Sequence, residues 1–216
     1  MRRGHHGLSV TQIVAGYAQG WFPMDDGFSR EVPWYAPDPR AVFELDPEAL
    51  DGTRRIVRRS LRDGAEWPLL LDQRFEAVVE RCGRPRSADD GVWLTPRMAR
   101  LYGDLHGAGL AHSFEIWVGD RLGAGLVAVT IGAAAMLESM FHTVPHAGNV
   151  LVVKTLEALA ANGYELCDIQ LISDHTRRLG AREIPRRAYE QRLRAALEGS
   201  HARSRMLRDD APTSRR

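Results

Sequence analysis

Three polar side chains lie inside two otherwise apolar, strand-like stretches of this sequence. Glu138 follows Leu137 in the first stretch, and Asp168 and Gln170 lie in the second, one expected helix later. A buried carboxylate costs free energy unless it is paired or hydrogen-bonded. Two carboxylates on neighbouring strands therefore predict a cleft that binds a cation or a reacting amine. The alternative, which the pattern leaves open, is that both carboxylates are buried structural partners of arginines.

A second feature is a run of arginines within residues 49–62. An α-helix over this range places all of them within roughly 140° of one another, with Ile56, Val57 and Leu61 opposite. No acidic residue lies among them to relieve their repulsion, and guanidinium groups bind phosphate in a bidentate manner. We expect this helix to contact a phosphate backbone, with a solvated helix face or a membrane-surface helix as alternatives. The arginines are Arg54, Arg55, Arg58, Arg59 and Arg62.

Prolines and large aromatic residues lie close together in residues 21–40. Proline fixes the backbone, and aromatic rings provide flat faces. One interpretation is a rigid platform that stacks an unpaired base. The other is a loop that its own aromatic side chains hold against the domain.

The composition excludes several classes of protein. The chain has 216 residues, 44% of them hydrophobic, and 29 basic against 28 acidic residues, so it is not a globally basic nucleic-acid binder. Two cysteines predict a reducing, cytoplasmic setting. We find no secretory leader, and no apolar run reaches the ~18 residues of a membrane span. The histidines match no common zinc spacing, so we expect no metal site.

Caps and periodicity predict the elements that position these side chains. Ser9 begins a capping box, and Thr95 with Pro96 begins a second helix. The other expected elements are a helix over residues 75–82, strands over 113–118, 122–131 and 133–141, a helix over 150–161, a strand over 164–171, a short helix capped by Asp174 and a helix over 186–197. Residues 69–71 form a short apolar run.

An antiparallel meander, a helix and a further strand in this order resemble the acyl-transferring fold of the GNAT type. That fold has a V-shaped gap between its central strands, which Glu138 and Asp168 could both face. We expect an α+β protein with a small N-terminal domain over residues 1–62 and a GNAT-like acyltransferase domain over residues 63–198. Residues 199–216 are polar and arginine-rich, and we expect a disordered tail there.

Several motifs, occurring in order over residues 8–197, resemble the leucyl/phenylalanyl-tRNA–protein transferase family. Any one of them alone would be a weak signal. They include Gly20-Trp21-Phe22-Pro23, Trp34-Tyr35-Ala36-Pro37-Asp38-Pro39-Arg40, Glu138-Ser139-Met140-Phe141, Asp168-Ile169-Gln170 and Leu179-Gly180-Ala181-Arg182.

The resemblance implies an enzyme that moves Leu, or Phe or Met, from aminoacyl-tRNA to a protein whose N-terminal residue is Arg or Lys. The product is thereby marked for degradation. The resemblance implies no cofactor, no metal and no acyl-CoA, and nothing in the sequence suggests more than a monomer. It also implies that the tRNA acceptor end contacts Arg55, Arg58, Arg59 and Arg62, and that the terminal adenosine contacts Tyr17 and Trp93.

The mechanistic hypothesis assigns a role to each residue of the motifs. Asp168 accepts or orients the attacking amine, and Gln170 fixes the geometry by hydrogen bonds. Glu138 helps to hold the cationic N-terminal residue. Met140 and Phe141 line the pocket for the donor's side chain, where a methionine adapts to more than one shape.

The sequence departs from the family pattern at several positions and leaves two rival functions. A non-enzymatic protein that binds tRNA or basic N-termini is one rival, for which the departures leave room. An acyl-CoA-dependent N-acyltransferase is the other, but residues 142–149 lack the glycine-rich turn that seats a pyrophosphate. The departures are Met24, Ala135, Leu137, Gly148, Asn149 and Thr155.

Overall fold

The computed structural model describes residues 8–85 and 93–198, so the tail expected over residues 199–216 lies outside the described residues. Its centre is a seven-stranded sheet in the order β4-β5-β6-β7-β8-β3-β9. The strands are β3 (Arg40–Phe43), β4 (Leu69–Leu71), β5 (Ala111–Val118), β6 (Arg121–Ile131), β7 (Ala134–His142), β8 (Leu166–Gln170) and β9 (Arg182–Ile184).

Strands β5 to β7 form the expected antiparallel meander, and β4, which was not predicted as a strand, pairs antiparallel with β5 at its edge. The helix α6 (Ala147–Ala161) then connects β7 to β8, which is parallel to it, as a parallel pair requires a crossover. The two strands pair only from Ala134 with Leu166 to Met136 with Asp168. Glu138 and Gln170 therefore lie beyond the last paired residues, where the two strands separate.

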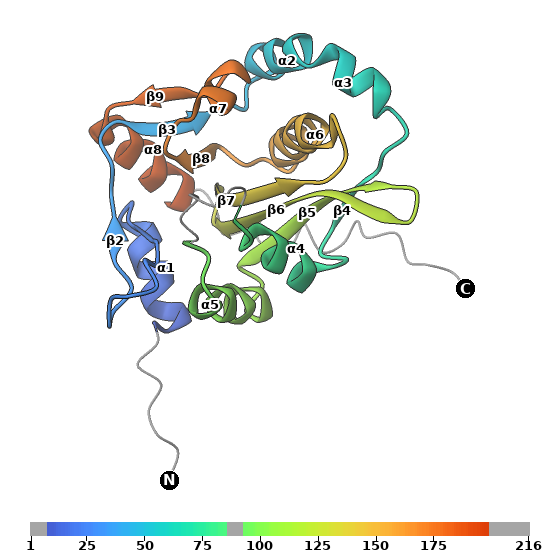
Figure 1. Cartoon of the computed structure of the whole chain (residues 1–216). Coiled ribbons are helices and arrows are strands. Elements are labelled where there is room, and N and C mark those ends of the chain that lie inside the picture. The colour runs from blue at the N-terminus through green and yellow to red at the C-terminus, as the bar shows by residue number, and fades with distance from the viewer. Residues whose placement is uncertain (1–7, 86–92, 199–216) are drawn as a thin grey trace.

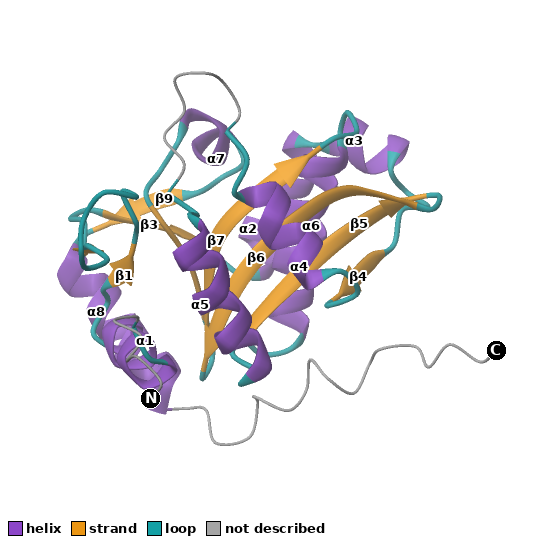
Figure 2. Ribbon diagram, turned by 60° about the horizontal axis from the view of Figure 1, so that its bottom comes forward, coloured by secondary structure: helices purple, strands orange, loops and turns teal. Residues whose placement is uncertain are grey.

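Helices cover both faces of the sheet (Figure 1). One core cluster joins the sheet to α1 (Val10–Ala18), α4 (Phe75–Cys82), α5 (Pro96–Gly107) and α8 (Arg186–Glu198). The other cluster lies on the opposite face and is built mainly on α6. Figure 2 shows α4 and α5 in front of the strands and α6 behind them. The remaining elements are β1 (Phe22–Pro23), β2 (Trp34–Tyr35), α2 (Pro47–Ile56), α3 (Arg58–Asp63) and α7 (Asp174–Arg178).

Local caps form as the sequence predicts. Ser9 and Gln12 form a capping box at α1. The Thr95 side chain accepts from the backbone N–H of Met98 at the start of α5, and Pro96 occupies the first turn. These signals are local, so the surrounding structure does not override them.

The single helix predicted over residues 49–62 is wrong. The chain forms α2 and α3, and Val57 separates them with φ −105° and ψ 22°. The break lets Val57 bury its side chain, while Ile56 is 56% exposed and so does not join an apolar face. Thr53 is the buried residue of α2, and Ser60 is the buried residue of α3. Each helix therefore packs against the rest of the protein through its own residue. Tertiary packing thus outweighs the helical periodicity of this stretch.

Two smaller predictions also need correction. Ser173, and not Asp174, caps α7, because its side chain accepts from the backbone N–H of Thr176. The short strands β3 and β9 are absent from the sequence-based prediction, although β3 pairs with both β8 and β9 inside the main sheet. Strands this short are stabilised by their neighbours, so their own sequence carries little signal.

The proline- and aromatic-rich segment after α1 is held against the main domain by a buried carboxylate. Asp25 accepts hydrogen bonds from the Thr95 hydroxyl at 2.5 Å and from Arg97 Nε at 3.0 Å. The Arg97 guanidinium is the main reason that the pKa of Asp25 falls from 3.8 to about 2. Phe22 and Trp34 also pack in the core cluster, as expected for a loop that its own aromatic side chains hold against the domain, but the Asp25 contacts were not predicted.

Thr155 of α6 gives a stability prediction. Its buried hydroxyl has no hydrogen-bond partner among the described residues. Thr155→Val keeps the shape and removes the unsatisfied group, so we expect it to raise the free energy of unfolding by about 1 kcal/mol. Urea unfolding measures the change. A loss of stability would show that the hydroxyl is hydrogen-bonded in solution.

Candidate active site

Glu138 lies where β7 and β8 separate, and two tyrosines hold its carboxyl group. The Tyr17 hydroxyl of α1 donates to Oε1 at 2.8 Å, and the Tyr102 hydroxyl of α5 donates to Oε2 at 3.1 Å. Burial raises the pKa of both phenols well above 10, so they remain donors. Burial also raises the pKa of Glu138 from 4.5 to about 8, although the phenol hydrogen bonds oppose the rise. Glu138 can therefore exchange a proton near neutral pH.

Asp168 is completely buried and is bound on both oxygens. Arg40 of β3 donates from Nε to Oδ1 at 2.9 Å and from Nη2 to Oδ2 at 2.6 Å. The Tyr189 hydroxyl donates to Oδ2 at 2.9 Å, and the backbone N–H of Gln170 donates to Oδ1 at 2.8 Å. A carboxylate accepts about four hydrogen bonds, so Asp168 has no acceptor site left.

Arg40 is held as firmly as its partner. Its Nη1 donates to the Gly20 carbonyl at 3.1 Å, and its guanidinium lies 4.9 Å from the Phe22 ring centre and 4.5 Å from that of Tyr189. The side chain is 1% exposed. This pair bears out the alternative interpretation of Asp168 as a buried partner of an arginine.

Gln170 ends β8 in a backbone conformation that side chains seldom adopt, with φ 59°. One atom of its side-chain amide lies 3.4 Å from Glu138 Oε1. With the amide nitrogen at this position, Gln170 donates to Glu138. With the amide turned over, the nitrogen donates to the Ile169 carbonyl at 2.9 Å and to the Leu137 carbonyl at 3.0 Å, and the oxygen faces Glu138.

A small cavity opens beside these groups, with a volume of about 160 Å³. Glu138 and Gln170 form its polar wall. Trp93, which lies edge-on to Tyr102 with ring centres 6.3 Å apart, forms part of its apolar wall. An apolar cavity with a few convergent polar groups is the usual form of a small-molecule site. The other lining residues are Phe22, Pro23, Met24, Ile169 and Leu171.

Only some of the site residues predicted from the sequence lie together beside Glu138 and the cavity. Tyr17 supports Glu138 and is 2% exposed, so its contact with adenosine stays a prediction. Met140 packs in the core cluster on the α6 side. Phe141 packs in the opposite cluster, with Arg81 5.4 Å from its ring centre. Neither lines the cavity beside Glu138, and their role in an aminoacyl pocket also stays a prediction.

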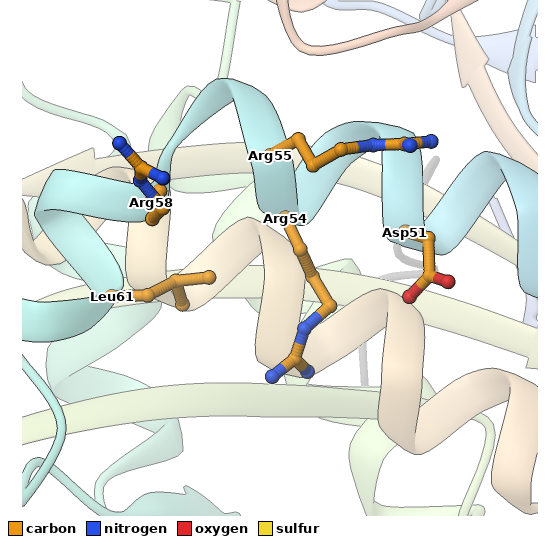
Figure 3. Close-up of a pocket in the computed structure, with 5 residues that line it drawn as sticks. All are labelled: Asp51, Arg54, Arg55, Arg58 and Leu61. Carbon is orange, nitrogen blue, oxygen red and sulfur yellow. The ribbon is translucent and has the colours of Figure 1, made fainter.

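The five arginines do not lie on the single helix that the sequence predicts over residues 49–62, because Val57 separates α2 from α3. Arg54 forms an ion pair with Glu157 of α6, whereas Arg55 and Arg58 project to other sides of the ribbon (Figure 3). Arg59 and Arg62 each lie 3.8 Å from Asp63. Within the described residues, no acidic partner is found for Arg55 or Arg58. These two line a surface hollow of about 440 Å³ together with Asp51, Arg54 and Leu61.

Sequence reasoning missed three residues that build the site. Arg40 is a charged residue that opens the apolar run Ala41-Val42-Phe43, and this position was a usable signal. Tyr102 and Tyr189 lie on apolar helix faces, where a tyrosine hydroxyl needs a partner.

Among the described residues, no cluster of side chains suited to a metal ion is found. None of the described helices has the length and apolar character to cross a membrane.

Comparisons with known proteins identify the family. The model of the leucyl/phenylalanyl-tRNA protein transferase N-terminal domain matches residues 7–38, and that of leucyl/phenylalanyl-tRNA protein transferase matches residues 45–194. The chain belongs to this family. It is therefore an enzyme, an aminoacyltransferase. The first match contains α1, β1 and β2, and the second begins just after β3.

Relatives in the leucyl/phenylalanyl-tRNA–protein transferase family align with almost the whole chain. A transferase of Anaeromyxobacter sp. (strain K) is 44% identical over 199 residues, which are 92% of this chain and 83% of the relative. A transferase of Salinibacter ruber is 40% identical, with 89% and 82% covered. One from Caulobacter vibrioides is 37% identical, with 88% and 86% covered.

Proposed function

We propose that the chain transfers Leu, or Phe or Met, from aminoacyl-tRNA to the α-amino group of a protein that begins with Arg or Lys, and so marks it for degradation. The names of the relatives support leucyl- and phenylalanyl-tRNA as donors and a protein as acceptor. The observation that carries the proposal is the cavity between β7 and β8, where Glu138 and Gln170 face Trp93. A desolvated carboxylate suits a cationic acceptor, and an indole suits the terminal base of the tRNA.

An aminoacyl ester is already activated, so positioning of the amine and the ester supplies most of the acceleration. The hypothesis that Asp168 itself receives the amine does not fit its four hydrogen bonds. We assign Asp168 the task of fixing the backbone of Gln170. Glu138 and Gln170 then present their polar ends to the two substrates.

We also propose that the main domain is of the GNAT type. The antiparallel meander, the crossover helix α6 and the parallel strand β8 that separates from β7 support this assignment. Acyl-CoA is not the donor in this proposal. Residues 142–149, which lead from β7 into α6, lack the glycine-rich pyrophosphate sequence, and the His146 side chain makes no capping hydrogen bond to α6.

Arg55 and Arg58 give a prediction for tRNA binding. The double variant Arg55→Ala/Arg58→Ala should weaken tRNA affinity about tenfold and reduce the slope of log K against log salt by about 1.5, since each lost phosphate contact removes 0.7–0.9. Filter binding over a series of salt concentrations measures both. Arg194→Ala, an exposed arginine on α8, is the matched control and should change neither quantity. Equal slopes for the double variant and the unmodified chain would contradict the assignment.

A transfer assay that crosses several aminoacyl-tRNAs with several peptides tests the proposed function. Peptides that start with Arg or Lys should receive Leu, and peptides that start with Asp or Met should not. Binding of tRNA and peptide without transfer would favour a non-enzymatic binding protein. Retention of the chain on immobilised CoA, with competition by free CoA, would favour the acyl-CoA rival.

A further inference from the structure

We propose that Glu138 is the catalytic residue that takes the proton from the incoming α-amino group, and that Asp168 is a positioning residue locked in place by Arg40 and Tyr189. The inference rests on the proposed function and names the proton acceptor of that reaction. The surface of the described residues has other hollows. One of these is a hollow of about 780 Å³ beside Arg81 and Phe141, where nothing among the described residues identifies an occupant.

The two carboxylates differ in access. Asp168 is 0% exposed and is absent from the lining of the cavity. All four of its acceptor sites hold protein donors, so an amine could reach it only if a buried ion pair opened. Glu138 lines the cavity directly. Its Oε2 accepts a single hydrogen bond, from Tyr102, and has one acceptor site left for a substrate N–H.

The groups around Glu138 favour reversible protonation. The phenols of Tyr17 and Tyr102 contact it from α1 and α5, while Arg40, Asp168 and Tyr189 influence it from β3, β8 and α8. Because Arg40 and Asp168 pair with each other, much of their charge cancels at Glu138. A pKa of about 8 matches that of an α-amino group, and matched pKa values make proton transfer efficient.

The Gln170 amide can accommodate both protonation states of Glu138. When Glu138 is ionised, the amide nitrogen 3.4 Å away can donate to it. When Glu138 is protonated, the turned amide presents its oxygen to the acid proton, and its nitrogen is satisfied by the carbonyls of Ile169 and Leu137. Asp168 accepts a hydrogen bond from the Gln170 backbone N–H and so fixes the position from which the amide can turn between these two orientations.

The chemical step balances without a further reactant. The α-ammonium group gives one proton to the Glu138 carboxylate, which yields a neutral amine and a carboxylic acid. The amine lone pair attacks the ester carbonyl carbon, so a C–N bond forms and the bond to the ribose oxygen breaks. The leaving ribose oxygen takes the second proton of the amine nitrogen, and Glu138 returns its proton to solvent.

The test measures kcat and KM for transfer of Leu from Leu-tRNA to an Arg-starting peptide with the full chain. Glu138→Gln keeps the shape of the side chain and should lower kcat at least about 100-fold while KM for the peptide changes less than about threefold. Formate should restore transfer in Glu138→Ala at least about tenfold, because it supplies a proton acceptor to the vacated site. Asp168→Asn should lower kcat with no formate rescue. Circular dichroism confirms that each variant is folded.

Two results would overturn the inference. One is a Glu138→Gln variant with unchanged kcat and a raised KM, which would make Glu138 only a holder of the cation. The other is formate rescue confined to an Asp168→Ala variant, which would make Asp168 the proton acceptor. If the unmodified chain transfers Leu to no peptide at all, the proposed function and the inference both fail, and this is seen before any substitution is made.

Discussion

Replacing Arg40 with methionine should lower the free energy of unfolding by about 3–5 kcal/mol and remove most of the transfer activity. The substitution leaves the Asp168 carboxylate buried without a counter-charge, because Arg40 makes two of its four hydrogen bonds. Gln170 then loses a fixed acceptor for its backbone N–H. Urea unfolding measures the stability, and transfer to an Arg-starting peptide measures the activity.

A matched control and a double variant separate the two consequences of Arg40→Met. Arg177→Met removes a guanidinium that is 58% exposed and pairs with Glu183, and it should cost less than about 1 kcal/mol. Arg40→Met/Asp168→Leu removes both buried charges and should recover much of the stability. It should not recover transfer, since Gln170 still lacks its acceptor. A single variant that is as stable and active as the unmodified chain would refute the role of the Arg40–Asp168 pair.

Glu138→Gln should raise the free energy of unfolding at pH 9 by roughly 5 kcal/mol and change it little at pH 4. The folded-state pKa of Glu138, about 8, lies above the unfolded value of 4.5. The folded chain therefore binds the proton more tightly. This stability is fully present below pH 4.5 and is lost as the pH rises through 8. A glutamine has no such proton to lose, so the variant has a higher free energy of unfolding than the unmodified chain only at alkaline pH.

Chemical denaturation at a series of pH values from 4 to 9 measures this difference between the variant and the unmodified chain. Glu66→Gln, at an exposed position between α3 and β4, is the control and should show no such pH dependence. If Glu138→Gln and Glu66→Gln behave alike over this range, Glu138 is not desolvated in the folded protein.

Much of the fold can be predicted because its signals are local. The capping box at Ser9, the Thr95–Pro96 start of α5 and the alternation of the meander each depend on neighbouring residues. The break at Val57 and the strand β3 depend instead on distant packing. Val57 turns inward toward the α6 side of the core, and β3 is stabilised by β8 on one side and β9 on the other.

The site could be predicted only in part, for a similar reason. Glu138 and Gln170 are conspicuous because they interrupt apolar runs. Their partners lie far away in the chain, with Arg40 128 positions from Asp168 and Tyr17 121 positions from Glu138. A pattern in one segment does not reveal which distant side chain completes it. The division of roles between the two carboxylates therefore required the three-dimensional contacts.

We propose that Glu138, desolvated and facing the cavity, is the carboxyl group that meets the acceptor amine. A carbon-13 NMR titration of the glutamate carboxyl groups tests it most directly, with Glu138→Gln used to assign the resonance. We expect a midpoint near pH 8 that moves to lower pH when an Arg-starting peptide binds, because the cationic peptide favours the ionised carboxylate. A midpoint near 4.5 that the peptide leaves unchanged would contradict it.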